Sequence, residues 1–269
     1  MNTVLTHFYN EEYLLPWWIN HHKKIFDNGI MINYHSTDRS VEICKDLCPP
    51  HWKIVNTVNA TIKPILNDVE VKVYENSVEG FKMTLTIGEF LLAPCPLENV
   101  NLFMLHNNIS YLKTFGVCMV DTDPDNLPTH DKSLIEQKHH GILTGYRAPL
   151  SMTLDPNHWW VPDPFNHLYG RYYHNQPFGD YLEGRHAVNS DKTFDVKDMF
   201  TLKYKYCPWN EITLNRMKAF DVKKHEADEV YNINTVDEHN QMHKYFLVPA
   251  HDLIDDYSFK TAYYHCMSL

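Results

Sequence analysis

Two short polar clusters hold the residues best suited to ligand chemistry. His7-Phe8-Tyr9-Asn10-Glu11 and Tyr34-His35-Ser36-Thr37-Asp38 each include or directly follow the end of an apolar run. Carboxylates in these clusters can accept hydrogen bonds from the N–H and hydroxyl groups of a ligand, and the main chain beside them can add further contacts. A structural alternative stands beside this one, because Asn10 and Asp38 are also suitable caps for the helices that follow them.

These clusters must be positioned by the elements around them. Apolar runs at 4–8, 29–34 and 52–58 predict strands, and helical spacing of apolar residues predicts helices at 14–26 and 40–47. The proline at position 16 requires the first helix to begin near it or to kink. Strands that alternate with helices imply parallel pairing, and ligands bind beyond the carboxyl ends of such strands. The sequence therefore predicts an α/β fold with a mostly parallel central sheet flanked by helices, in a single domain over 1–269.

Composition limits the partners and the location that we expect. The chain has 24 Lys and Arg against 34 Asp and Glu and a net charge of −10, which argues against nucleic acid as a partner. No run approaches the ~20 apolar residues that span a bilayer, and the first residues lack the pattern of a secretory signal. The six cysteines show no paired zinc spacing and are interpreted as reduced thiols. We therefore expect a cytoplasmic protein, and the sequence leaves its oligomeric state open.

Residues 4–58 resemble the GT-A glycosyltransferases, the nucleotide-diphospho-sugar transferases, and within them the family-2-like and family-92-like branch. The resemblance rests on Phe8-Tyr9-Asn10-Glu11-Glu12, on the Trp and His residues of the following helix, and on the turn Tyr34-His35-Ser36-Thr37-Asp38-Arg39-Ser40. Weaker matches lie at 86–91 and 202–206. The sugar transferases of large algal viruses, the chloroviruses, are similar in their His- and Asn-rich, Gly-poor composition, and a viral origin would place the protein in the host cytoplasm.

This resemblance implies a glycosyltransferase that moves a sugar, as hexosyltransferases do, from a nucleoside-diphosphate sugar to a glycan acceptor in glycan biosynthesis. Residues 1–92 would form the half that binds the nucleotide donor, with UDP or GDP as the nucleotide. Residues 93–269 would form the acceptor half and the C-terminal segment. The nucleotide-binding residues that the resemblance implies are His7, Phe8, Tyr9, Asn10, Glu11, Tyr34 and Asp38.

The chain departs from this family at the motif that binds metal. Relatives carry Asp-x-Asp-Glu-Phe where this sequence has Thr86-Ile87-Gly88-Glu89-Phe90, so the two carboxylates that hold a divalent cation are absent. By the resemblance, Glu89 and His186 are left to bind manganese or magnesium weakly. The same departure keeps open a catalytically degenerate protein that binds a nucleotide sugar or a carbohydrate on this fold. In a further alternative, arginine or lysine neutralises the diphosphate in place of metal, with Arg147, Arg171 and Arg185 as candidates.

An aromatic segment at 157–184 supplies the candidates for the acceptor side. It is rich in Trp, Tyr, His, Pro and Asn and has little periodicity, which is typical of a functional loop. Trp159 and Trp160 can stack on sugar rings and Asp163 can bind hydroxyls, although such aromatics can equally form core. Asp180 and Glu183 are the candidates for the general base of an inverting transferase. A glycoside hydrolase with two carboxylates would explain the aromatics but not the order of strands and helices.

A second Asp-x-Asp pair, Asp121 and Asp123, lies outside the family's position. We interpret it as part of a solvated loop bounded by proline, with metal binding as the alternative. Further strands are predicted at 81–92 and 117–120, and a helix at 209–224.

Overall fold

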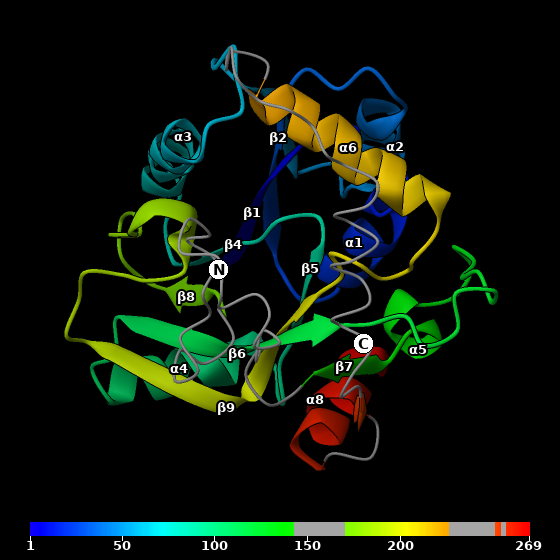
Figure 1. Cartoon of the computed structure of the whole chain (residues 1–269). Coiled ribbons are helices and arrows are strands. Elements are labelled where there is room, and N and C mark those ends of the chain that lie inside the picture. Colours follow the sequence, from blue (N-terminus) through cyan, green and yellow to red (C-terminus); the bar gives the residue numbers. More distant parts are fainter. Residues whose placement is uncertain (143–169, 226–250, 254–256) are drawn as a thin grey trace, which may run out of the picture.

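The computed structural model of the chain describes residues 1–142, 170–225, 251–253 and 257–269. Its N-terminal strands are β1 (Asn2–Phe8), β2 (Asn28–Asn33), β3 (Lys53–Asn56) and β4 (Phe81–Thr84). These four strands are parallel and lie in the order β3-β2-β1-β4. The helices between them are α1 (Leu15–His22), α2 (Ser40–Leu47) and α3 (Pro64–Asn76). Figure 1 shows β1 between α3 on one side and α1 and α2 on the other.

The apolar runs of β1 and β2 are buried on both faces, as parallel strands covered by helices require. Successive side chains of a strand point to opposite faces. Val4 therefore packs in the cluster that contains Trp18 of α1, whereas its neighbour Leu5 packs in the cluster that contains Val71 of α3. The predicted α/β fold class, with a mostly parallel sheet flanked by helices, is confirmed.

A second group of strands extends the same sheet beyond β4. These strands are β5 (Glu89–Leu92), β6 (Tyr111–Met119), β7 (His140–Ile142), β8 (Tyr172–His174), β9 (Thr193–Lys203) and β10 (His251–Asp252). β8 is antiparallel between β4 and β6, and β9 is parallel to β6 and antiparallel to β5. β7 and β10 continue the far edge in antiparallel pairs. The accompanying helices are α4 (Leu97–His106), α5 (Leu134–Gln137), α6 (Glu211–His225), α8 (Tyr257–Met267) and the short 3-10 helix η2 (Glu183–Arg185).

The segment 81–92 forms two strands with a turn between them, so the single strand predicted there is wrong. The chain leaves β4 at Thr84, and the Glu89 N–H donates to the Thr86 carbonyl at 2.9 Å. Trp18 of α1 holds this turn, because its indole N–H lies 3.1 Å from the Thr86 carbonyl oxygen and 2.9 Å from that of Glu89. The turn contains Thr86, Ile87 and Gly88 and therefore sets the position of the Glu89 side chain.

The first helix begins after the polar cluster that precedes it. α1 starts at Leu15 with Pro16 in its first turn, where the missing N–H costs no intrahelical hydrogen bond. Asn10 does not cap this helix but has φ +51° and bonds to the loop after β2. Of the two alternatives for Pro16, a helix that begins near it is confirmed. The strand predicted at 117–120 is the end of β6, and the helix predicted at 209–224 corresponds to α6.

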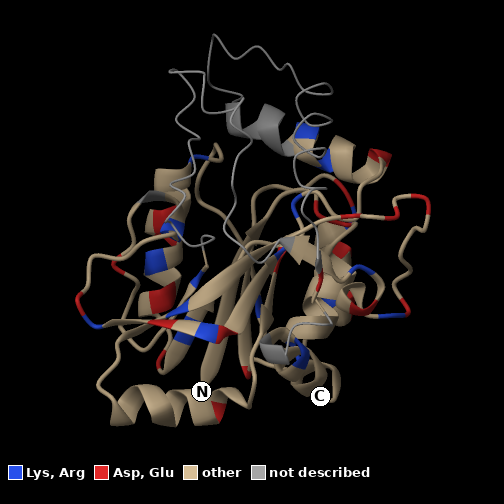
Figure 2. Ribbon diagram, turned by 60° about the horizontal axis from the view of Figure 1, so that its bottom comes forward, with Lys and Arg blue, Asp and Glu red and all other residues tan. Residues whose placement is uncertain are grey.

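The sheet is continuous across the two predicted halves of the chain, since 1–92 and 93–269 both contribute strands to it. That 1–92 binds the donor and 93–269 binds the acceptor stays a prediction. Charged residues of both signs are interspersed along the described chain (Figure 2). Among the helices of the described ranges, none combines the length and the apolar character needed to cross a membrane.

Candidate functional site

The carboxyl ends of β1 and β2 carry the two polar clusters, and hydrogen bonds join them. The Asn10 side-chain oxygen accepts the Thr37 N–H at 2.8 Å, and the Asn10 N–H donates to the Ser36 hydroxyl at 3.1 Å. The Glu11 N–H donates to the Ser40 hydroxyl at 2.8 Å. Asn10 suits this junction because its short amide side chain tolerates a left-handed backbone. The structure thus brings both clusters together at one edge of the sheet.

The carboxylates of Asp38 and Glu11 already have partners within the protein. The Asp38 oxygens accept the N–H groups of Glu12 at 3.1 Å and of Ser40 at 3.0 Å, so this carboxylate supports the start of α2. One guanidinium nitrogen of Arg216 lies 2.9 and 3.0 Å from the two Glu11 oxygens. Burial raises the pKa of the Glu11 carboxyl, and Arg216 opposes that shift. A role of either residue in nucleotide binding stays a prediction.

The aromatic residues of the two clusters differ in their exposure. Phe8 and Tyr34 are buried, and the Tyr34 hydroxyl donates to Glu70 of α3 at 2.7 Å. Their side chains belong to the core, which leaves main-chain groups for a ligand. Tyr9 is half-buried and packs against the cluster on the α3 side. His7 is also half-buried, with its ring edge-to-face with Tyr34 at a centroid distance of 5.7 Å.

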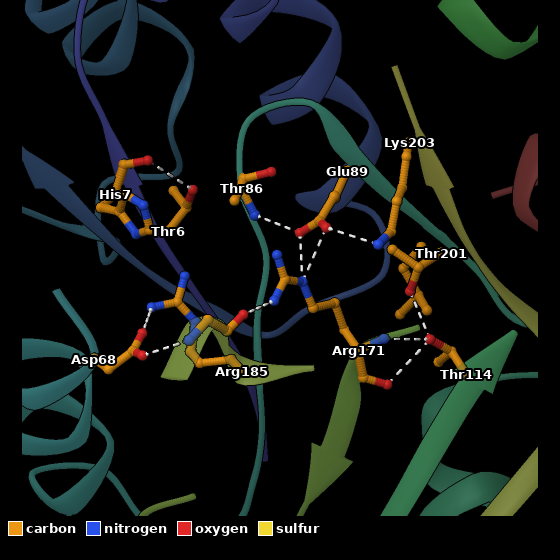
Figure 3. A network of polar contacts seen from close by, with 12 residues as sticks. Thr6, His7, Asp68, Thr86, Glu89, Thr114, Arg171, Arg185, Thr201 and Lys203 are labelled. Carbon is orange, nitrogen blue, oxygen red and sulfur yellow. Dashed lines mark hydrogen bonds and ion pairs between the residues drawn. The ribbon is translucent and has the colours of Figure 1, made fainter. Parts of the chain in front are cut away.

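Glu89 lies at the centre of a buried network of charged groups (Figure 3). The Arg171 Nε lies 2.9 Å from each Glu89 oxygen, and the Lys203 ammonium lies 3.9 Å from one of them. The Thr86 N–H donates to the same carboxylate at 2.9 Å. Burial alone would raise the pKa of Glu89, but Arg171 and Lys203 outweigh it and lower the pKa to about 2. Glu89 is therefore ionised, and it is paired with cations.

Arg171 is held in place by its backbone. Its N–H donates to the Thr114 hydroxyl at 2.9 Å, and its carbonyl accepts the Thr114 N–H at 2.9 Å. The Thr114 and Thr201 hydroxyls are 2.6 Å apart, so both β6 and β9 support this position. A Cβ at Gly170 would overlap the Thr114 carbonyl oxygen, which makes glycine necessary directly before Arg171. From there the Arg171 guanidinium also donates to the Gly184 carbonyl at 2.6 Å.

Arg185 brings a second guanidinium group beside the first. It lies 2.5 Å from one carboxylate oxygen of Asp68 on α3, and the other oxygen accepts the Gly184 N–H at 2.9 Å. Gly184 and Arg185 have φ values of +80° and +60°, and glycine makes the first of these accessible at little cost. The Arg185 side chain is buried, and its Nε has no hydrogen-bond partner among the described residues. A buried donor without a partner is costly, so an acceptor atom from a ligand would stabilise it.

Among the residues that the structure describes, this network holds more positive than negative groups. Arg171, Arg185 and Lys203 face the two carboxylates of Glu89 and Asp68. Burial, together with the charge of Arg171, lowers the pKa of Lys203 to about 8, although Glu89 opposes this shift. The same two causes lower the pKa of Arg185. Because the cations disfavour one another here, an anion bound beside them would be stabilised.

Two histidines next to the network are neutral. Burial and the charges of Arg185 and Arg171 lower the pKa of His7 to about 3. Burial and the charges of Arg171 and Lys203 lower that of His186 to about 2. The His7 Nδ1 is buried and has no hydrogen-bond partner among the described residues. Since neutral imidazole can donate one hydrogen bond and accept another, His7 suits a polar ligand.

The groups around Glu89 do not fit a divalent cation in the place of the Asp-x-Asp motif. Thr86 and Gly88 offer no carboxylate, and both Glu89 oxygens face a guanidinium group. A metal ion bound there would lie beside the charge of Arg171 in a buried site, where repulsion is strong. The charges around Glu89 favour a bound anion over a second cation. Weak metal binding by Glu89 and His186 stays a prediction.

Of the two candidates for the base, Glu183 lies in η2 directly before Gly184 and Arg185 of this network, whereas Asp180 lies away from it. Asp180 is exposed, and the adjacent Gly179 N–H donates to Glu75 at 2.7 Å. Glu75 lies about 10 Å along α3 from Asp68, at 1.5 Å per residue, so Asp180 is at the other end of this helix. Trp159, Trp160, Asp163 and Arg147 belong to the segment 143–169, which lies outside the described ranges. The side chain of Glu183 is also outside the description.

Asp121 is buried, so the solvated loop predicted for the second Asp-x-Asp pair is wrong for this residue. Its carboxylate accepts the Lys138 ammonium at 2.7 Å, the Trp209 N–H at 2.8 Å and the Asp123 N–H at 3.2 Å. Asp123 itself is exposed, as predicted. The pair therefore has a structural role at the end of β6.

Lys203 and Asp68 are the members of the charged network that sequence reasoning missed. Lys203 meets Glu89 because β5 and β9 pair in a register that sets the two residues opposite each other. The only signal was the weak match at 202–206, which pointed to a basic segment without a partner. Asp68 is one of several acidic residues on α3, and nothing in its spacing singles it out.

Comparisons with known proteins gave partial structural likenesses. No family model and no curated protein matches the chain. Glucosyl-3-phosphoglycerate synthase from Mycobacterium tuberculosis, solved with phosphoglyceric acid, is 14% identical with a TM-score of 0.32 over 43% of this chain and 44% of its own. Core-mannan synthase A from Aspergillus fumigatus, in its Mn/GDP form, is 12% identical with a TM-score of 0.28 over 48% and 44%. A 4-diphosphocytidyl-2C-methyl-D-erythritol synthase from Anaerococcus prevotii is 11% identical with a TM-score of 0.30 over 49% and 64%.

These likenesses cover less than half of this chain and less than two thirds of each similar structure. The fold class stated above rests on the strand topology itself. None of the three proteins is viral, and the resemblance to chlorovirus transferases stays a prediction.

Proposed function

We propose that this protein is a glycosyltransferase that moves a sugar from a nucleoside-diphosphate sugar to a glycan acceptor. In this proposal Arg171, Arg185 and Lys203 neutralise the diphosphate of the donor in place of a metal ion. The observation that carries it is the net positive, buried network beside the joined loops of β1 and β2. UDP or GDP as the nucleotide and a hexose as the sugar follow from the sequence resemblance alone.

The candidate site offers groups that match the diphosphate of a nucleotide sugar, with main-chain groups beside them. The joined loops present main-chain groups at the carboxyl edge of a parallel sheet, which is where open α/β sheets bind their ligands. Guanidinium groups match phosphate oxygens in charge and in geometry. The Arg185 Nε and the His7 Nδ1 still have hydrogen-bonding capacity for those oxygens.

The charged network also suits the transfer step. The bond between the anomeric carbon and the diphosphate breaks, and the diphosphate leaves with the bonding electrons and one more negative charge. The acceptor hydroxyl oxygen forms the new bond to the anomeric carbon and gives its proton to a base. Cations that are fixed before the reaction stabilise such developing charge without reorganisation. Asp180 and Glu183 stay the candidates for the base, and Trp159, Trp160 and Asp163 for the acceptor site.

Thermal unfolding with and without metal tests this function. Protein treated with EDTA is melted alone and with UDP, GDP and their sugars, each with and without added manganese. We expect one nucleotide to raise the melting temperature in EDTA, by the equivalent of about 2.7 kcal/mol at 100 times its dissociation constant. Flat curves with every nucleotide would refute nucleotide binding. Stabilisation that requires manganese would refute the replacement of metal by arginine and lysine.

The substitution Glu89→Gln distinguishes two hypotheses for diphosphate binding. In one the cations bind the diphosphate directly, and in the other Glu89 holds a metal ion. It removes a negative charge from the network, so we expect the affinity for the nucleotide in EDTA to rise or hold. Stability should fall by about 3 kcal/mol, because Arg171 loses its buried partner. If Glu89 were a metal ligand, nucleotide affinity in manganese would fall instead. Glu79→Gln, which removes an exposed carboxylate, is the matched control.

Hydrolysis of the donor in the absence of acceptor distinguishes a transferase from a degenerate protein. The degenerate protein would bind the nucleotide sugar without catalysis. Many transferases release nucleoside diphosphate slowly when water replaces the acceptor. Release that depends on Arg171 supports the enzyme, whereas tight binding without release would indicate the degenerate protein.

A further inference from the structure

A second cluster of ligand-type side chains lies at the far edge of the sheet, on β7 and β10. These strands pair antiparallel with Asp252 opposite His140, and the Leu253 N–H donates to the His139 carbonyl at 3.1 Å. One nitrogen from each of His139 and His140 and one oxygen of Asp252 all lie within 4.8 Å of one another. The nucleotide site proposed above uses none of these residues.

The hydrogen bond of His139 fixes which of its nitrogens faces the carboxylate. The His139 Nδ1 lies 3.2 Å from the Glu136 carbonyl oxygen, which can only accept, so Nδ1 carries a proton. In the neutral ring the Nε2 then presents its lone pair, and this atom lies 3.5 Å from an Asp252 oxygen. The two atoms therefore face each other at a separation that a metal ion can bridge.

The spacing matches what a metal ion would require. Ligand atoms bound at about 2.0–2.1 Å in a tetrahedral site lie roughly 3.3 Å apart. The separation of 3.5 Å between His139 and Asp252 already meets this condition. The rings of His139 and His140 are stacked at a centroid distance of 5.0 Å and an angle of 26°, and one nitrogen of His140 lies within 4.8 Å of the other two ligand atoms.

Two imidazoles and one carboxylate form a donor set for a transition metal rather than for magnesium or calcium. Imidazole favours zinc and its neighbours, whereas hard cations prefer oxygen ligands alone. A backbone carbonyl that orients a ligating histidine through its other nitrogen, as that of Glu136 does here, is the usual supporting contact in such sites. The side chains of His139 and Asp252 are 25% and 40% exposed, which leaves a path for the ion and a position for water.

We propose that His139, His140 and Asp252 bind a zinc ion, or a transition metal of similar preference, with water as the fourth ligand. The ion would join β10, which contributes only two residues to the sheet, to β7. It would thereby fasten the strand that precedes α8 to the edge of the fold. The site is independent of the proposed transferase activity.

Zinc titration of the full chain after removal of metal by a chelator tests this proposal. We expect one equivalent to bind and to raise the melting temperature in the absence of nucleotide, with no such effect from magnesium. Cobalt should give the visible absorption of a tetrahedral site with nitrogen ligands. His140→Ala and Asp252→Asn should each weaken zinc binding by at least roughly tenfold, the loss seen when even a supporting contact of a ligand is removed.

Controls of the same residue types are available on the surface. His106→Ala and Asp125→Asn replace exposed residues and should leave zinc affinity unchanged. Absence of zinc binding would overturn the proposal. The proposal would also be overturned if zinc binding were unchanged in both His140→Ala and Asp252→Asn. Because the readout uses no nucleotide, its outcome is independent of whether the protein binds a nucleotide sugar.

Discussion

Two buried ion-pair networks follow the carboxyl ends of strands in this sheet, and they differ in how fully their groups are satisfied. After β6, one carboxylate meets one ammonium, and Asp121 accepts two backbone N–H groups besides the Lys138 ammonium. The same ammonium also donates to the Asp123 carbonyl at 2.6 Å. After β4, by contrast, the described residues place three cations around two carboxylates, and the Arg185 Nε and the His7 Nδ1 have no hydrogen-bond partner among these residues.

This difference separates a structural network from a binding network. A balanced pair whose hydrogen bonds are all made gains nothing from a further ligand, and breaking it is costly. An unbalanced network with unused donors is stabilised by an anion, because the anion supplies both the missing charge and the missing acceptors. Substitutions in the network after β6 should therefore change stability, whereas loss of an unbalanced cation after β4 should change ligand binding.

The largest effect that we expect is on stability, from Asp121→Asn. The change leaves the buried Lys138 ammonium without its carboxylate, and breaking a buried pair in this way costs about 3–5 kcal/mol. Denaturant unfolding measures the loss. Asp123→Asn removes the same charge from an exposed position of the same loop and should change stability little. Nucleotide affinity of the folded protein should be unchanged in both variants. If Asp121→Asn abolished nucleotide binding in folded protein, the proposed contrast between the networks would be broken.

Lys203→Met should show the opposite pattern. Burial disfavours the charge of Lys203, and Arg171 still pairs with Glu89 when this lysine is lost, so stability should change by only about 1 kcal/mol or less. Nucleotide affinity should fall by about 1.5–3 kcal/mol, the contribution of a hydrogen bond to a charged group. Calorimetry in EDTA measures it, with Lys205→Met at an exposed position of the same segment as the control. An equal loss in both variants would indicate only a general effect of charge.

The pH dependence of nucleotide binding also tests the role of the Lys203 charge. In the free protein the pKa of Lys203 is lowered to about 8, so its ammonium is mostly charged below pH 8 and mostly neutral above it. A bound diphosphate favours the charged form, so binding takes up a proton above pH 8, and affinity falls as pH rises. The expected loss approaches tenfold per pH unit, or about 1.4 kcal/mol. Calorimetry in buffers of different ionisation enthalpy counts the protons. In Lys203→Met the step near pH 8 should vanish, and if it persists another group is responsible.

The parts of the site that are local in sequence could be predicted, and the parts that depend on distant pairing could not. The polar clusters after β1 and β2 were found because an apolar run followed by Asn, Ser, Thr and Asp is a local pattern. Lys203 was missed because only the register between β5 and β9 sets it opposite Glu89. The environment of Asp121 was mistaken for the same reason, since its partners Lys138 and Trp209 come from other segments.

The smallest effect that we expect is from Asp38→Ala, at the junction of the loops after β1 and β2. Both Asp38 oxygens accept backbone N–H groups, from Glu12 and from Ser40, so the loss should resemble that of a helix cap, ~1 kcal/mol of stability. Nucleotide affinity should then stay within about a factor of two, the range of a change below 0.5 kcal/mol. Asp38→Asn keeps one acceptor oxygen and should recover part of the stability. Thermal unfolding and nucleotide titration of the two variants measure both quantities. If affinity fell tenfold or more while stability held, Asp38 would be a ligand of the nucleotide, as the sequence resemblance implies. The joined loops would then belong with the charged network after β4 as part of the binding surface.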